Sequence, residues 1–322
     1  PKHNTSVRNY ILANTDLVGT LATPLAPVVN AAVATKPVRM IMDKVMGIDH
    51  RRIFPKYSHG TFESWYRRHA AEQQASFERQ VSYFHGCYVN YNNPQLGKDM
   101  ILSLMIRIMN ALGYGVRLLE KEKCCGVALI SNGLYSQAKR QARTNMESIR
   151  TAVKGDGRDV ITTSSTCTFT IRDEYPHLLD LENGDVRDHV ELATRYIYRL
   201  INEQGAKLRF REDVGPLRVA YHTPCHMEKM GWAYYSIELL RMIPSVEVTV
   251  LDSQCCGIAG TYGFKKENYQ TSQAVGEPLF RQIEASGADL VATDCETCKW
   301  QIEMSTSKRC EHPLSILASR LA

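Results

Sequence analysis

The chemistry of this sequence centres on two adjacent cysteine pairs, each followed by glycine. Cys255-Cys256-Gly257 lies in the second half of the chain, and the same three residue types occur earlier as Cys124-Cys125-Gly126. A lone cysteine precedes each pair and another follows it at similar spacing: Cys87 and Cys167 around the first pair, Cys225 and Cys295 around the second. Because thiolates bind zinc, copper(I) and iron–sulfur clusters, this internal repeat favours metal ligands or redox thiols built twice on one plan.

The second set is the fuller one. It offers five thiols: Cys225, Cys255, Cys256, Cys295 and Cys298. Four thiols fill a tetrahedral zinc site and leave one over, whereas a multi-iron cluster can use all five. The glycines that follow the pairs, Gly126 and Gly257, are expected to let the backbone approach an inorganic core or ligand. A thioredoxin-like role for Cys295-Glu-Thr-Cys298 is disfavoured, because the motif follows the third predicted strand of its half and not the first.

The first set has only four thiols. Its members are Cys87, Cys124, Cys125 and Cys167, and Thr170 stands where the second set has Cys298. Four thiols can still hold an iron–sulfur cluster. A zinc site, an iron with an open position and a vestigial site all remain open at this point.

Three histidines lie near the cysteines. His222 and His226 bracket Cys225 at i and i+4, so one of them is expected to face the site, and either is a candidate proton donor to a bound molecule such as a quinone. His85 is expected to bind a strand-end carbonyl. The charges Glu228 and Lys229 fit a site role and a solvent-facing role equally, and Cys310, outside both sets, is expected in the core or at the surface.

Each half of the chain predicts strand–helix–strand–helix–strand. The predicted strands span 80–85, 116–119 and 159–163, then 217–221, 246–251 and 288–293; the predicted helices span 96–112, 134–153 and 189–200, then 234–242 and 268–285. This order indicates an α/β fold with two pseudo-repeated, three-layer, parallel-sheet domains. The cysteines fall just past the carboxyl ends of the strands, where open α/β sheets build binding sites, so distant sulfurs are expected to converge there.

The predicted domain boundaries follow from this order of strands and helices. Residues 1–78 form a mostly helical arm, 79–203 the first domain, 204–216 a charged linker and 217–322 the second domain. The arm holds ten Lys and Arg but four Asp and Glu within residues 1–68, and its apolar stretch is broken by Pro24 and Pro27. It is interpreted either as an interfacial segment on an anionic membrane or as an arm packed across the domains or onto a partner subunit.

Composition narrows the class of protein. The chain has 322 residues, 44% of them hydrophobic, which is enough for one or two real cores. Its ten cysteines are too sparse for a small secreted disulfide scaffold, and vicinal pairs rarely satisfy disulfide geometry. We see no run of 18 apolar residues and expect no spanning helix. No secretory signal or nucleic-acid motif is found, so no nucleic-acid partner is expected. The start at Pro1 reads like mid-protein sequence, so an upstream segment is expected.

These motifs resemble a known family. His85-Gly86-Cys87, the two Cys-Cys-Gly triplets, Cys225 and Cys295-Glu-Thr-Cys298 resemble the doubled cysteine-rich CCG domain of the heterodisulfide reductase B subunit and the glycolate oxidase iron–sulfur subunit. The longer runs 221–231, 252–264 and 294–300 are similar, more specifically, to the family of C subunits of anaerobic glycerol-3-phosphate dehydrogenases. The likeness covers nearly the whole chain, the arm included.

The resemblance implies a subunit of a respiratory oxidoreductase that does not itself oxidise the substrate. Such a subunit passes electrons from the flavin-bearing A and B subunits to menaquinone, as a peripheral protein at the cytoplasmic face of the inner membrane. In the heterodisulfide reductase relatives each CCG motif holds a non-cubane [4Fe-4S] cluster. Carried over, the second set is complete and the first lacks its last cysteine at Thr170. The family's chains normally begin with a ferredoxin-like region, and because this sequence has no Cys-x-x-Cys-x-x-Cys run, we do not expect that region among its 322 residues. Thiol–disulfide catalysis at a cluster and a zinc-stabilised interaction scaffold are kept as alternatives.

Overall fold

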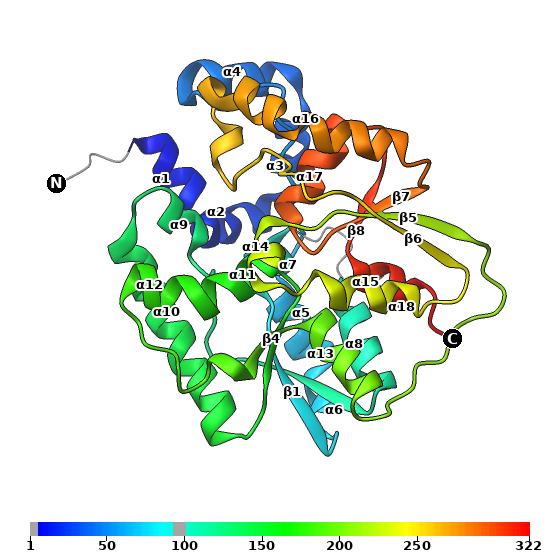
Figure 1. Ribbon diagram of the computed structural model, residues 1–322. Coiled ribbons are helices and arrows are strands. Elements are labelled where there is room, and N and C mark those ends of the chain that lie inside the picture. Colours follow the sequence, from blue (N-terminus) through cyan, green and yellow to red (C-terminus); the bar gives the residue numbers. More distant parts are fainter. Residues whose placement is uncertain (1–5, 93–100) are drawn as a thin grey trace.

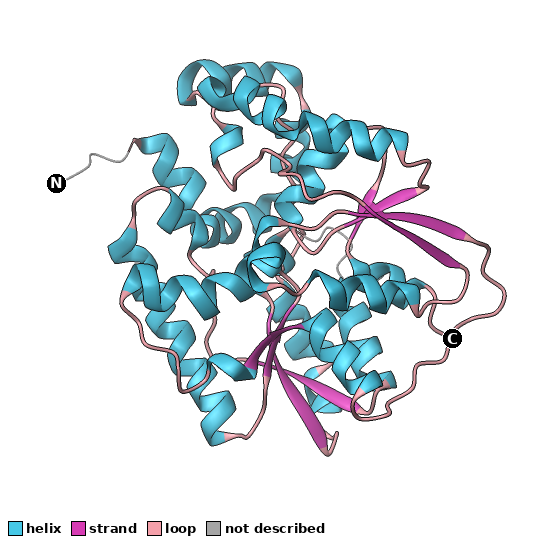
Figure 2. Ribbon diagram, in the orientation of Figure 1, coloured by secondary structure: helices cyan, strands magenta, loops and turns pink. Residues whose placement is uncertain are grey.

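Two parallel four-stranded sheets organise the molecule (Figures 1 and 2). The computed structural model describes residues 6–92 and 101–322. In the first sheet the strands lie in the order β2-β1-β3-β4 and in the second β6-β5-β7-β8, so the two sheets repeat one topology. Their bounds are β1 Arg79–Phe84, β2 Tyr114–Leu118, β3 Val160–Thr162, β4 Val190–Leu192, β5 Leu217–Tyr221, β6 Val246–Val250, β7 Leu290–Ala292 and β8 Cys310–Glu311. The predicted α/β class with two repeated parallel sheets is confirmed.

The prediction of three strands per sheet is wrong by one in each half. The fourth strand of the first sheet, β4, lies where the sequence predicted helix, and it is followed at once by α13 Ala193–Asn202. The fourth strand of the second sheet, β8, is only two residues long and carries Cys310. Such short strands have no periodicity of their own; they form because their backbones pair with β3 and β7.

The predicted helices 134–153, 234–242 and 268–285 correspond to α10, α15 and α16, and the other helices below, apart from α8, were not predicted. The first half has α7 Gly86–Tyr91, α8 Ile101–Ala111, α9 Val127–Ser131, α10 Tyr135–Arg150, α11 Ser165–Phe169 and α12 Tyr175–Leu179, with a π-helical turn Thr170–Glu174 between the last two. The second half has α14 Cys225–Met230, α15 Ala233–Arg241, α16 Tyr269–Ala285, α17 Glu296–Ser305 and α18 Pro313–Ser319. The start of the helix predicted from residue 96 lies outside the described residues.

One apolar core joins the two halves. It contains Val81 and Tyr83 of β1 together with Val219 and Tyr221 of β5, and it continues into α18 through Leu314. Two smaller clusters surround the cysteines of the first and of the second half separately. The shared core therefore fixes the two sheets relative to one another, while each sulfur set keeps its own apolar surroundings.

The arm is helical and makes hydrogen bonds to both halves of the molecule. Its elements are α1 Val7–Ala13, α2 Thr15–Ala22, a 3-10 turn Thr23–Leu25, α3 Ala26–Ala34, α4 Lys36–Met46, α5 Phe62–His69 and α6 Ala71–Ala75. Asp16 accepts from the backbone N–H of Cys124 at 2.7 Å in the first half. The buried Arg52 binds Gln301 and donates to Ser272 at 2.9 Å in the second. The arm packs across the domains, as one of the two interpretations expected.

The expectation of no spanning helix meets one candidate among the described residues. Thr15–Ala34 forms a helical run that is long and apolar enough to cross one, by length and composition, and 22% of it is buried in the structure. The expectation rested on the lack of 18 consecutive apolar residues; the helical run forms despite Pro24 and Pro27, because Pro24 lies in a 3-10 turn and Pro27 in the first turn of α3, where proline is tolerated. Length and composition are weak signals, since buried helices also pass this test.

Candidate metal centres

The four cysteines of the first set meet at the carboxyl edge of the first sheet. Cys87 lies in the first turn of α7, which follows β1. Cys124 and Cys125 follow β2, and Cys167 lies in α11, after β3. The sulfurs of Cys87 and Cys124 are 3.6 Å apart. Cys125 hydrogen-bonds to both Cys124 and Cys167 through its thiol. These contacts link all four thiols in one chain.

The five cysteines of the second set meet in the same way. Cys225 opens α14 after β5, Cys255 and Cys256 follow β6, Cys295 is the N-cap residue of α17, and Cys298 lies in its first turn. The sulfur of Cys225 is 3.9 Å from that of Cys255, and the sulfur of Cys256 is 3.2 Å from that of Cys298. A thiol hydrogen bond from Cys298 reaches Cys295. The predicted convergence of distant sulfurs is therefore present at both sheet edges.

Thiol–thiol contacts concentrate negative charge in both sites. Hydrogen bonds from Cys125 and Cys87 lower the pKa of the Cys124 thiol. In the second site, hydrogen bonds from Cys225 and Cys256 lower the pKa of Cys255, and the hydrogen bond from Cys298 lowers the pKa of Cys295 to about 6. The same contacts raise the pKa of partner thiols such as Cys125 and Cys298, and since thiolates are the metal ligands, metal binding would release protons from them.

The glycines after the cysteine pairs have a packing reason. Gly126 and Gly257 both adopt left-handed backbone, at φ +91° and +82°. A Cβ on Gly257 would lie 2.0 Å from the Ser272 carbonyl oxygen of α16, and one on Gly126 would meet Ala138 of α10 at 3.6 Å. The close approach that glycine permits is thus to the crossover helix, not to a ligand. The N–H of Gly257 does point at the Cys255 sulfur, at 3.3 Å, and contact with a cofactor stays a prediction.

Thr170 does not replace the missing fifth thiol. Its side chain is buried and its hydroxyl donates to the Glu174 carboxylate at 2.8 Å. A hydroxyl is a poor ligand for soft metals, and this one already has a partner. The first set therefore ends at four sulfurs.

The two strand-end histidines differ in their surroundings. His85 follows β1, and its Nδ1 lies 3.0 Å from the Gly86 carbonyl oxygen and 3.1 Å from the Glu122 carboxylate. The expected carbonyl partner is therefore present. His222 follows β5, and a ring nitrogen lies within 4.8 Å of the Cys256 and Cys298 sulfurs. Of the two histidines that bracket Cys225, His222 faces the sulfur set. Burial lowers the pKa of both His85 and His222 to about 4, so both rings are neutral at pH 7.

His226 points the other way, toward the first half. Its ring stacks on Phe169 at 4.9 Å between centroids, and its Nδ1 lies 3.1 Å from the Thr166 hydroxyl. Glu228 and Lys229 are exposed on α14, and the Lys229 ammonium lies 5.1 Å from the centre of the Phe169 ring. Cys310 is fully buried on β8 and belongs to the core.

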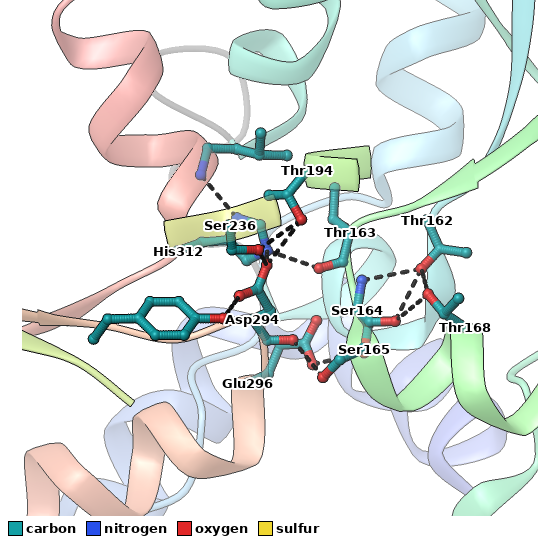
Figure 3. Close-up of polar contacts among 12 residues, drawn as sticks. Thr162, Thr163, Ser164, Ser165, Thr168, Thr194, Ser236, Asp294, Glu296 and His312 are labelled. Atoms are coloured by element: carbon teal, nitrogen blue, oxygen red, sulfur yellow. Dashed lines mark hydrogen bonds and ion pairs between the residues drawn. The ribbon is translucent and has the colours of Figure 1, made fainter. Parts of the chain in front are cut away.

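The two sulfur sets are neighbours across a polar contact that sequence reasoning missed. The β3–α11 and β7–α17 connections face one another around Asp294, which Figure 3 shows at the centre of the contact. Asp294 is fully buried and accepts from Tyr221 at 2.7 Å and from Ser236 at 3.0 Å, while its carbonyl accepts from Ser165. Next to this contact, the Thr166 hydroxyl lies 3.7 Å from the Cys295 sulfur, and Thr166 adjoins Cys167. A residue adjacent in sequence to a first-set cysteine thus contacts a second-set sulfur.

A cavity of about 740 Å³ lies beside α7 and α17, the helices that carry Cys87 and Cys298, and no cysteine lines it. Tyr88, next to Cys87, and Trp300, two residues after Cys298, both line it, and their ring centroids are 5.6 Å apart. Its other walls include Phe54 and Leu104 together with five cations, Lys56, Arg107, Lys299, Arg309 and Arg320. This volume lies within the range of ordinary small-molecule sites.

Comparison with known proteins bears on this geometry. Residues 81–172 and 219–303 match the cysteine-rich CCG domain family, and both matched stretches contain a Cys-Cys-Gly triplet. The chain is 63% identical to the C subunit of the anaerobic glycerol-3-phosphate dehydrogenase of Escherichia coli, over 98% of this chain and 78% of that protein. The chain belongs to the family of C subunits of anaerobic glycerol-3-phosphate dehydrogenases.

More distant relatives are also iron–sulfur or redox proteins by name. The chain is 28% identical to the D subunit of the dihydromethanophenazine:CoB–CoM heterodisulfide reductase of Methanosarcina barkeri, over 68% of this chain and 52% of that protein. It is 26% identical to an iron–sulfur protein of Methanocaldococcus jannaschii, over 71% of this chain and 42% of that protein. The expected class of function, an iron–sulfur subunit with an electron-transfer role in this family, is thereby confirmed.

Proposed function

We propose that the second site holds a non-cubane [4Fe-4S] cluster on Cys225, Cys255, Cys256, Cys295 and Cys298, and that the first site holds a second cluster on Cys87, Cys124, Cys125 and Cys167. The observation that carries this is the unbroken chain of thiol contacts in each set. Five sulfurs exceed what a tetrahedral zinc ion uses and suit a multi-iron core. The donor set therefore fits the cofactor.

These clusters would relay electrons from the flavin-bearing A and B subunits of a glycerol-3-phosphate dehydrogenase to menaquinone. A relay needs redox centres that are close to one another, and the Thr166 hydroxyl, next in sequence to Cys167, lies 3.7 Å from the Cys295 sulfur. Of the two candidate proton donors, His226 is only partly buried whereas His222 is 1% exposed, so His226 is the better placed to exchange protons with solvent; it does not line the cavity described next.

The cavity beside Tyr88 and Trp300 is our candidate for the quinone headgroup. Its aromatic walls suit a planar ring, and its lysines and arginines can donate to carbonyl oxygens. Ser315→Trp would place an indole in this space. We expect about a tenfold higher KM for a soluble menaquinone analogue with unchanged iron content. Ser131→Trp, at an exposed serine outside the cavity lining, is the control, and an unchanged KM in Ser315→Trp would exclude this cavity.

We further propose that the arm lies on the anionic cytoplasmic face of the inner membrane. Leu17, Leu21, Leu25 and Val28 are exposed along the α2–α3 run, and Met40, Ile41 and Val45 are exposed on α4. Lys36 and Lys44 lie exposed on the same helix, α4, while its only acid, Asp43, is buried against Lys266. An apolar surface with neighbouring cations suits anionic lipid better than a neutral one.

Vesicle flotation tests this arm. Leu21→Glu combined with Val45→Glu should abolish flotation with vesicles of anionic phospholipid, since the two substitutions place negative charges on the apolar face that would contact the lipid. Leu178→Glu, an equally conspicuous apolar residue on α12 in the first half, should float like the wild type. Flotation of the double variant at the wild-type level would instead assign the exposed face to the A and B subunits.

Metal analysis separates the cluster proposal from its alternatives. We expect about four iron and four sulfide per occupied site in protein prepared without oxygen. Near-zero iron with stoichiometric zinc would indicate an interaction scaffold. Reduction of a heterodisulfide with electrons supplied would favour thiol–disulfide catalysis, a role to which the named heterodisulfide reductase relative points.

A further inference from the structure

His222 is a buried histidine whose ring has no hydrogen-bond partner. Its side chain is 1% exposed, and within the described residues neither Nδ1 nor Nε2 is hydrogen-bonded. Its backbone is fixed, because its N–H donates to the Ala292 carbonyl oxygen of β7 at 2.9 Å. The backbone of His222 is therefore anchored at the strand end, while its ring nitrogens have no hydrogen-bond partner among the described residues.

An unpaired buried donor is costly. Leaving one unsatisfied destabilises the fold, which is why buried polar side chains almost always have partners. Two sulfurs lie near this ring: a ring nitrogen is within 4.8 Å of the sulfurs of Cys256 and Cys298. A thiol is a weak acceptor, whereas a sulfur bearing the charge of a metal centre is a much better one.

The first half shows what a satisfied histidine looks like at the same place. His85 also follows the first strand of its sheet, and it is bound by the Gly86 carbonyl and by Glu122, two residues before Cys124. The residue two positions before Cys255 is Ser253, which is exposed to solvent and offers no carboxylate to the buried ring. The second half therefore has no counterpart of Glu122 at this position to bind the His222 ring.

We infer that an N–H of His222 donates a hydrogen bond to a sulfur of the second metal centre, and so stabilises its more negative, reduced form. The second set already offers five thiolates to the proposed cluster, so we assign the ring as a donor to sulfur and not as a sixth ligand. Hydrogen bonds to cluster sulfurs raise the reduction potential. This inference rests on the cluster proposed above.

Nitrogen hyperfine coupling in the wild-type chain tests the contact directly. Protein labelled with ¹⁵N-histidine is brought to the paramagnetic state of the second cluster, which is recognised by its loss in Cys256→Ser. We expect a weak coupling from one histidine nitrogen. A coupling of the size of an iron-bonded nitrogen, or no coupling at all, would overturn the inference.

Redox titration of matched variants tests the consequence. His222→Phe keeps a planar ring but removes the donor, and it should lower the equilibrium constant for reduction about tenfold, which is about 59 mV for one electron. His222→Gln retains an N–H donor and should recover most of the difference. His85→Phe, at the matching position of the first half, should leave the second cluster's potential unchanged.

The outcomes keep this inference separate from the proposed function. Absence of iron from the wild-type chain would remove the cluster proposal itself. An iron-loaded His222→Phe with the wild-type potential would remove only the role of His222. If His222→Phe loads no iron, the coupling in the wild-type chain decides.

Discussion

The first half of the molecule satisfies its site with its own groups, whereas the second half leaves groups unsatisfied. In the first half Glu122 accepts from the backbone N–H groups of His85 and Gly86, and Thr170 donates to Glu174. In the second half Cys298 occupies the position that corresponds to Thr170, and its sulfur lies 3.2 Å from that of Cys256. The His222 ring has no hydrogen-bond partner among the described residues.

This difference teaches how a repeated fold supports unequal sites. The strand order and the positions of the cysteine loops are the same in both halves, because backbone pairing sets them. The number of sulfurs and the state of the histidine are set by single side chains. Two sheet edges of the same architecture can therefore carry centres with different numbers of cysteine ligands, five in one and four in the other.

The largest effect should come from removing one cysteine at a time from matching positions. Cys256→Ser should abolish the electron paramagnetic resonance signal of the second cluster, because the residue sits in the middle of the five-sulfur chain. Cys125→Ser, its counterpart, should leave that signal intact and lower iron only at the first site. If both variants lose the same signals and the same iron, the two sets form one shared centre and the comparison fails.

Adding a fifth thiol to the first half should make the halves more alike. Thr170 follows Cys167 by three residues, as Cys298 follows Cys295. Thr170→Cys should raise the iron retained by the first site after gel filtration in air, measured in a Cys256→Ser background. Thr170→Ser, which keeps the hydroxyl, should behave like the parent. Equal iron in the Cys and Ser variants would show that four sulfurs already complete this site.

The polar contact between the halves should contribute substantially to stability. Asp294→Ala removes the acceptor of the buried Tyr221 hydroxyl, and an unsatisfied buried donor costs about 1–3 kcal/mol. Ser165→Ala removes one donor to the Asp294 carbonyl and should cost less, about 0.5–1.5 kcal/mol. Urea unfolding of the two variants measures the difference. A smaller loss in Asp294→Ala than in Ser165→Ala would mean that Asp294 is not the centre of this contact.

The smallest effect is a pH dependence at the same contact. His312 donates through Nε2 to the Thr163 carbonyl at 2.8 Å and accepts through Nδ1 from the Leu314 N–H. Burial lowers the pKa of His312, so below about pH 6.5 the unfolded chain binds more protons and the free energy of unfolding falls as the pH falls. His312→Gln should reduce this slope by at most about 1.4 kcal/mol per pH unit between pH 7 and 5. Parallel wild-type and variant curves would contradict the assignment.

Much of the fold could be predicted from the sequence, because its signals are local. The alternating or apolar runs at 217–221 and 246–251 coincide with β5 and β6, and the amphipathic stretch 268–285 coincides with α16. The short strands β4 and β8 could not be predicted, since two or three residues carry no periodicity. The arm's apolar run was misjudged because proline in a 3-10 turn or a first helical turn breaks less than proline in a helix interior.

For the site, the repeated cysteines and their placement after strands were enough to identify two sets of ligand candidates and to make the second set the larger. The folded chain was needed to see which histidine faces the sulfurs, that Glu122 contacts His85, and that Asp294 and Thr166 link segments of the two halves. The physical reason is that spacing along the chain fixes which sheet edge a side chain reaches, whereas hydrogen-bond partners come from segments distant along the chain, in the same half or in the other. Tertiary packing sets these partners, and no local sequence pattern encodes them.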